Sequence, residues 1–148
     1  MAPAYQPTPL ATAWAAALSE GTPRIALGNF LDDWRRFPDP QRRALLVEMP
    51  IADAPITDAT EHNAYDEAGD TGHLHRWACF MAAAVEFLTV RDGVPTPDWV
   101  YWDCWTLSTP WFMFPHWKLR AWQLAATPPP WKRRRIFGGD ATALIGRV

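Results

Sequence analysis

The chain has 148 residues, of which 49% are hydrophobic and 20% are charged, and its formal net charge is −2. This length suits a single core, and this composition is typical of a folded globular chain rather than a disordered one. The small net charge excludes a generally basic nucleic-acid-binding protein and a protein with a strongly acidic tail. We therefore expect one domain over residues 1–148.

Several sequence features bear on the cellular compartment of the protein. The two cysteines, Cys79 and Cys104, lie among apolar residues and do not form a spaced disulfide framework of the secreted kind. The N-terminus starts without a basic segment and its Ala-rich stretch is interrupted by Glu20, which argues against a signal peptide. The longest apolar stretch, 77–90, contains Glu86 and is too short to span a bilayer. These features predict a reduced, cytoplasmic protein without a membrane partner.

Thr-Pro and Asp-Pro dipeptides recur along the chain. Proline suits the first helical turn because the missing N–H has no partner there, and the preceding side chain can cap the helix. Each pair precedes an apolar-rich segment and is expected to start a helix. The pairs are Thr8-Pro9, Thr22-Pro23, Asp39-Pro40, Thr96-Pro97 and Thr109-Pro110.

The first fifty residues are expected to form three short helices, over about 9–20, 23–36 and 40–49. In the second helix, Leu27, Phe30 and Trp34 recur at the spacing of one buried helical face. An acidic loop should follow at 51–72, where six Asp or Glu residues occur without a Lys or Arg.

Residues 73–126 are expected to contain a central helix and Trp-rich helices. The central helix should run from about residue 71 to residue 90, with a stripe of large apolar side chains, and should end at Arg91-Asp92-Gly93. The stripe consists of Leu74, Trp77, Met81, Val85 and Leu88. This helix is predicted to be buried.

The last part of the chain combines tryptophan, proline and basic residues. A short Trp-rich helix near 97–105 and a helix at about 116–126 should precede a Pro- and Arg-rich tail at 127–148. The triple proline at 128–130 favours an extended polyproline II link. Seven Lys or Arg and one acidic residue occur from position 115 to the end, so the charge is polarised.

No catalytic motif is present, and no cofactor is predicted. His75 and Cys79 are spaced i, i+4 and could face one metal ion, but His73 would point away from His75 on a helix. A helix-terminal histidine pair and a core thiol are therefore preferred to a metal site. An enzyme of unrecognised type stays open as an alternative if acidic-loop residues meet His73 or His75. The residues concerned are Asp58, Glu61, Asp66 and Asp70.

Ten tryptophans exceed ordinary usage, and Trp, Tyr and Arg dominate binding hot spots. Core packing is the expected fate of most rings, and Trp34, Trp77 and Trp122 lie on predicted buried stripes. Part of the remaining aromatic cluster, with the basic run, forms the predicted partner-binding surface. Its residues are Trp99, Trp102, Trp105, Trp111, Trp131, Lys132, Arg133, Arg134, Arg135 and Phe137.

Short segments over residues 77–148 carry a resemblance. They are AAAVEFL (82–88), GVPTPDW (93–99), PWF (110–112), LRA (119–121), Thr127-Pro128 and RRRIF (133–137), with ALGNFL (26–31) in the first half. Together they resemble a family of small proteins common in actinobacteria and associated with toxin–antitoxin or mobile-element operons. In that family an Asn or Gly follows the Arg run, whereas Ile136 follows it directly here. The resemblance implies an antitoxin-like or regulatory interaction protein rather than an enzyme.

The sequence thus predicts an all-α protein, a compact bundle of about six helices with an extended Pro-rich, basic C-terminal segment. Its expected function is non-catalytic binding of a protein partner, such as a toxin encoded nearby, through the Trp-rich C-terminal third and the basic tail. A nucleic-acid-binding regulator that uses the same tail is the alternative, because phosphates attract clustered Arg and Lys.

Overall fold

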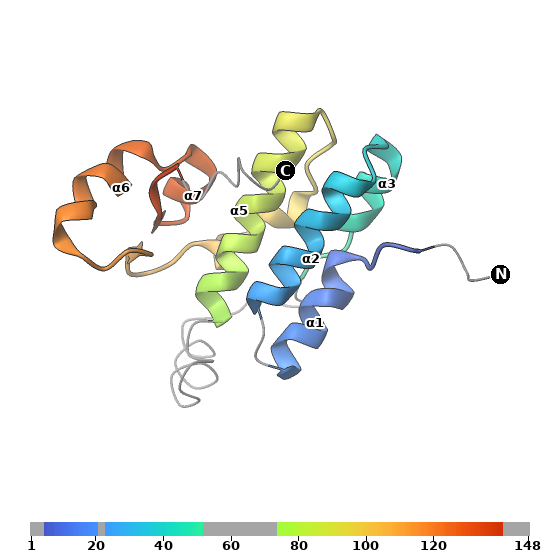
Figure 1. Cartoon of the computed structure of the whole chain (residues 1–148), viewed down its shortest axis with the longest axis horizontal. Helices are drawn as coiled ribbons and strands as arrows, with labels where there is room; N and C mark the ends of the chain where they lie inside the picture. Colours follow the sequence, from blue (N-terminus) through green and yellow to red (C-terminus); the bar gives the residue numbers. More distant parts are fainter. Residues whose placement is uncertain (1–4, 21–22, 52–73, 141–148) are drawn as a thin grey trace.

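The computed structural model describes residues 5–20, 23–51 and 74–140 (Figure 1). These residues form six α-helices, short 3₁₀ helices and a two-stranded parallel sheet, which confirms the predicted all-α class. The α-helices are α1 (Leu10–Glu20), α2 (Pro23–Arg36), α3 (Pro40–Val47), α5 (Leu74–Asp92), α6 (Arg120–Ala126) and α7 (Pro129–Arg133). The other elements are η2 (Asp98–Tyr101), η3 (Asp103–Trp105), η4 (Trp117–Leu119), β1 (Trp111–Phe112) and β2 (Ile136–Phe137).

The first three helices lie close to their predicted bounds. α2 covers the predicted residues, and α3 starts where the Asp39 carboxylate accepts a hydrogen bond from the Gln41 amide at 3.2 Å. α3 ends at Val47 rather than at the predicted Met49. Pro50 disfavours helical backbone at the residue before it, so the helix stops earlier.

α5 is the central helix. In Figure 1 it lies between α2 on one side and α7 on the other, and it also contacts η2 and η3. From Ala78 to Thr89 every side chain except that of Phe87 is buried, as predicted for this helix. Gly93 has a φ of +69°, and the Val94 amide donates to the Thr89 carbonyl, so the helix ends in a left-handed cap at the predicted place.

Buried tryptophans join distant segments of the core. The indole N–H of Trp34 donates to the Asp92 carboxylate at 2.7 Å, and that of Trp99 donates to the Val47 carbonyl at 2.8 Å. These hydrogen bonds satisfy the two buried indole N–H groups and fix each ring to a distant segment. The Trp131 ring is fully buried between Phe80 and Phe87 and docks α7 onto α5.

The prediction of a helix after Thr109-Pro110 is wrong, because that pair precedes β1. The strand pairs in parallel with β2, with Trp111 opposite Ile136. The Trp111 amide donates to the Arg135 carbonyl at 2.8 Å, and the Met113 amide donates to the Phe137 carbonyl at 2.9 Å. Backbone bonding to a distant segment outweighs the local helix signal.

The prediction of an extended Pro-rich segment is also wrong for residues 129–133, which form α7. Pro128 is extended, with a ψ of 152°, but Pro129 and Pro130 occupy the first turn of the helix, where a missing N–H costs nothing. Arg135 then takes a φ of +63° and turns the chain into β2. The basic run therefore lies on the bundle.

The expected acidic loop, apart from Ile51, lies outside the described residues. None of the described helices is long and apolar enough to span a membrane.

Candidate functional site

The basic run, residues 132–135, forms ion pairs with a buried carboxylate. Glu86, on α5, is 2% exposed and forms ion pairs with Arg133 and Arg134, the latter at 2.6 Å between Oε2 and Nη1. Arg134 is itself only 5% exposed, and its guanidinium also donates to the carbonyls of Pro130 and Val100, at 2.7 and 2.6 Å. Arg134 therefore joins α5, α7 and η2 from inside the protein.

The other two cations of the run also have partners within the chain. The Arg135 side chain donates to the Ser108 carbonyl at 2.8 Å, and the Lys132 ammonium donates to the Ala125 carbonyl at 3.4 Å. Arg133 and Arg135 remain exposed. The side chains of the predicted binding tail therefore mostly make contacts within their own chain.

The predicted aromatic site residues do not form one exposed surface. Trp99, Trp105 and Trp131 belong to the buried core. Trp111 and Phe137 are half-buried against other aromatic rings, Trp77 and Phe112 respectively. Among the predicted partner-binding tryptophans only Trp102 is exposed.

Exposed aromatic side chains gather instead at residues 114–124, which we call the aromatic arm. It spans η4 and most of α6, and Figure 1 shows α6 projecting at the end of the molecule opposite α3. Trp117 is 71% exposed, the highest value among the large hydrophobic side chains of the described residues. The exposed large hydrophobic residues of the arm are Phe114, Trp117, Leu119, Trp122 and Leu124.

The prediction that Trp122 is buried is therefore wrong. Gln123 takes the inward position of α6 and is fully buried. Trp122 instead lies against Gly139, where an added Cβ would come within 2.4 Å of the indole ring. A signal for exposure was present in the sequence, because Trp122 and Leu124 are two residues apart, lie on different sides of a helix and cannot both face the core.

Hydrogen bonds give the arm a defined shape. The Gln123 side chain accepts from the Phe114 amide at 3.0 Å and donates to the Phe114 carbonyl at 2.9 Å, which closes the arm on itself. His116 caps η4, since its Nδ1 accepts from the Lys118 amide at 3.2 Å. Thr127 accepts from the Gly139 amide at 2.9 Å and ties the end of the arm to the segment after β2.

The arm lies in a stretch of one charge sign. Residues 104–139 contain no Asp or Glu. On the arm, the Lys118 ammonium lies 5.6 Å from the centroid of the Trp117 ring, and the Arg120 guanidinium lies 5.1 Å from that of Phe112. Such contacts stabilise a cation over an aromatic face. The arm therefore presents apolar rings together with exposed positive charge.

An apolar groove lies between α3 and η2. It has a volume of about 700 Å³, and Leu45, Pro97 and Trp102 line it together with two carboxylates, Glu48 and Asp98. We call this hollow the α3–η2 groove. Pockets of about 300–1,000 Å³ are typical of ligand sites.

His75 and Cys79 are brought together inside the protein. The His75 Nε2 lies 3.6 Å from the Cys79 sulfur and 2.7 Å from the Cys104 carbonyl oxygen. Across residues 5–20, 23–51 and 74–140, no three His, Cys, Asp or Glu side chains are grouped to hold a metal ion. The other residues of the enzyme hypothesis, Asp58 to His73, lie outside the described residues.

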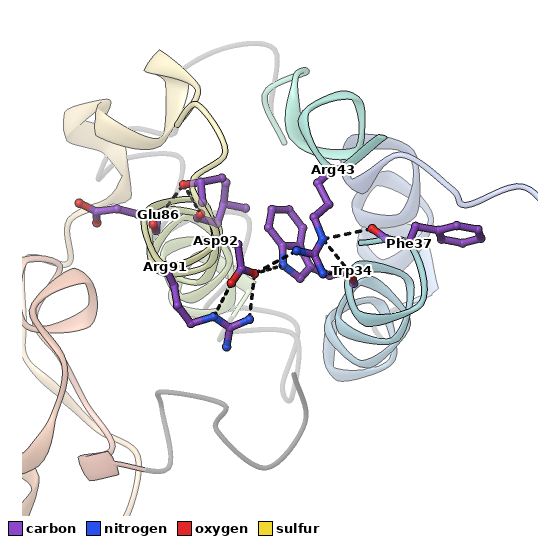
Figure 2. Close-up of polar contacts among 8 residues, drawn as sticks. Trp34, Phe37, Arg43, Glu86, Arg91 and Asp92 are labelled. Carbon is purple, nitrogen blue, oxygen red and sulfur yellow. Dashed lines mark hydrogen bonds and ion pairs between the residues drawn. The ribbon is translucent and has the colours of Figure 1, made fainter. Parts of the chain in front are cut away.

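Asp92 is a second polar centre, shown in Figure 2 at the end of α5. Its carboxylate accepts from Trp34, from Arg91 at 2.8 Å and from Arg43 at 3.4 Å. The hydrogen bond from Arg91 is the main cause that lowers the pKa of Asp92, and the Trp34 bond and the charge of Arg43 act in the same direction. Arg43 also donates to the carbonyls of Trp34 and Phe37, so the cluster joins α2, α3 and α5.

Comparisons of the chain with protein-family models, with curated proteins and with solved structures found no match. The features that bear on function are therefore those of the chain's own sequence and surface.

Proposed function

We propose that this chain is a non-catalytic, antitoxin-like or regulatory protein whose aromatic arm binds an apolar, acidic surface of a protein partner. The observation that carries the proposal is the arm itself, in which large apolar side chains are exposed within an acid-free stretch. Exposed apolar clusters of this kind mark interaction sites, and tryptophan is enriched at binding hot spots.

The shape of the arm favours binding. Gln123 and His116 hold its backbone, so little conformational freedom remains to be lost when a partner binds. Lys118 and Arg120 would steer the arm toward a negatively charged surface and would exclude a basic one. The resemblance to small operon-encoded partner proteins supports the antitoxin-like class.

The distribution of arginines favours a protein over a nucleic acid as the partner. Binding to phosphates needs several unengaged cations, because affinity grows with each phosphate neutralised. Arg134 is buried against Glu86, and the exposed Arg133 pairs with the same carboxylate, so the basic run offers less free positive charge than its sequence suggests. Two cations remain on the arm beside much larger apolar surfaces.

The proposal is tested with the full chain and the product of the neighbouring gene, co-expressed and co-purified, with affinity then measured by calorimetry. Trp117→Ala should raise the dissociation constant about thirtyfold or more, as expected for a central hot-spot tryptophan. Ile25→Ala, which truncates an exposed residue of α2 away from the arm, is the matched control.

Unchanged affinity in Trp117→Ala would contradict the role of the arm. Binding of DNA or RNA by the full chain that weakens steeply with salt and is lost in Lys118→Ala would instead assign the arm to nucleic acid. Neutralisation of a toxic neighbour by the wild-type chain, and not by Trp117→Ala, would support the antitoxin class.

A further inference from the structure

We infer that the aromatic arm of one copy docks in the α3–η2 groove of a second copy, so that two chains form a reciprocal dimer. The inference rests on the proposed role of the arm as a binding surface, but it needs no other protein.

The groove has the chemistry that complements the arm. Its apolar wall includes Leu45, which is 64% exposed, and the half-exposed ring of Trp102. The chain segments that form its walls, 41–50 and 95–102, contain the carboxylates of Glu48 and Asp98, both of which line the groove. A partner that fills it should therefore combine apolar rings with positive charge.

Arg42 and Arg43 are the basic residues of these segments, and both are engaged elsewhere. Arg43 donates to Trp34 and pairs with Asp92, and the guanidinium of Arg42 lies over the Phe37 ring. Neither lines the groove. Two neighbouring hollows share Trp102 with the groove. Asp103 lines one of them, and Arg133 and Arg134, both paired with Glu86, line the other.

The arm has the opposite set of groups. Trp117 offers an exposed indole beside Lys118, and Arg120 follows on the first turn of α6. Among the described residues, the arm is thus an apolar surface with basic groups. The groove on the same chain is an apolar surface with acidic groups. Opposite charge at the rim of an apolar contact gives both specificity and a faster encounter.

A single copy cannot make this contact. Figure 1 places α6 and α3 on opposite sides of α5, with α2 also between them, so the arm would have to detach from the core to reach its own groove. A second copy can offer its groove without such a change. If the two copies are related by a twofold axis, each inserts its arm into the groove of the other. Every arm and every groove of the dimer is then occupied.

The test is the oligomeric state of the full chain, measured by analytical ultracentrifugation over a range of concentrations. The wild-type chain should be a dimer, and both Trp117→Ala on the arm and Leu45→Glu in the groove should raise the dimer dissociation constant about thirtyfold or more. Ile25→Glu, which places the same charge on an exposed site of α2, should leave the dimer unchanged.

Mixing the two variants provides the decisive measurement. The Leu45→Glu chain keeps its arm and the Trp117→Ala chain keeps its groove, so the mixture should form a heterodimer through one intact contact, tighter than either variant alone. A monomeric wild-type chain, a dimer that survives both substitutions, or a mixture that gains nothing would each overturn the inference.

The outcomes separate this inference from the proposed function. A monomer that still binds the neighbouring-gene product through Trp117 would overturn the dimer alone. Because the dimer would occupy the arm, binding of that product is measured on the Leu45→Glu chain, whose arm is free. Failure to bind there, with a dimeric wild type, would overturn the proposed function alone. Loss of that product's binding in Leu45→Glu, with a monomeric wild type, would assign the groove to the partner instead and would overturn the dimer.

Discussion

At the scale of single residues, Glu86 and Asp92 show how α5 tolerates charge. Both carboxylates lie on a helix that is buried along most of its length, and both are met by arginines from other elements. A charge removed from water is costly unless it is paired and hydrogen-bonded, and the pairing then becomes a requirement of the fold. These two positions therefore link α5 to its neighbours on either side.

Substitution of Glu86 by Ala should lower the free energy of unfolding by about 3–5 kcal/mol, because it leaves the buried Arg134 guanidinium without its counter-charge. Arg133→Ala removes the exposed partner of the same carboxylate and should cost about 1 kcal/mol or less. Urea denaturation followed by circular dichroism measures both. Equal losses of unfolding free energy in the two variants would contradict the conclusion that the buried Glu86–Arg134 pair is the stabilising one.

Asp92 should make stability depend on pH. Because the folded-state pKa lies below the ordinary value of about 3.9, the contribution of this group is complete above about pH 5 and is lost as the pH falls toward the folded-state pKa. Asp92→Asn should lower the free energy of unfolding at neutral pH by about 1–3 kcal/mol.

The difference between the wild-type chain and Asp92→Asn should stay constant above about pH 5 and shrink below about pH 4. Thermal melts at a series of pH values measure it, with Asp32→Asn on the exposed side of α2 as the control. A difference that grows on acidification would show that the pKa of Asp92 is not lowered by folding.

At the scale of elements, the arm differs from the helices of the bundle. α5 is stabilised by burial along its length, whereas most side chains of α6 are exposed and Gln123 supplies its inward contact. Short helices are marginal in water without tertiary support. The shape of the arm therefore depends on a few hydrogen bonds rather than on an apolar core.

Gln123→Leu should loosen the arm while sparing the bundle, because leucine has a similar volume but cannot bond to the Phe114 amide and carbonyl. Hydrogen exchange should become faster at residues 114–124 and stay unchanged in α5. Exchange that remains slow in the arm would show that packing, not Gln123, holds it.

At the scale of the whole molecule, the surface for partners is separated from the part that maintains the fold. α1, α2, α3, α5 and α7 share the core, and the arm projects from the opposite end to α3 (Figure 1). The Arg run belongs to the fold through Glu86, although its composition suggests a binding tail. Charge polarity in the sequence thus did not identify which cations are exposed.

The local sequence was sufficient for the helices of the first half and for α5. Capping by Asp39, the i, i+3 and i+4 spacing in α2 and the Gly93 stop act between neighbours in the chain, so they can be recognised without the fold. The all-α class followed from them. The long acid-free, Trp-rich segment was also visible in the sequence.

Tertiary structure decided which tryptophans and arginines are buried. Glu86 and Arg134 are 48 residues apart, and the Trp99 indole bonds to a carbonyl 52 residues away, so neither pairing has a local signal. The same holds for β1, whose partner strand follows α7, and for α7 itself, which packs Trp131 on α5 instead of extending. Burial depends on what covers a side chain, and that cover comes from residues distant in the sequence.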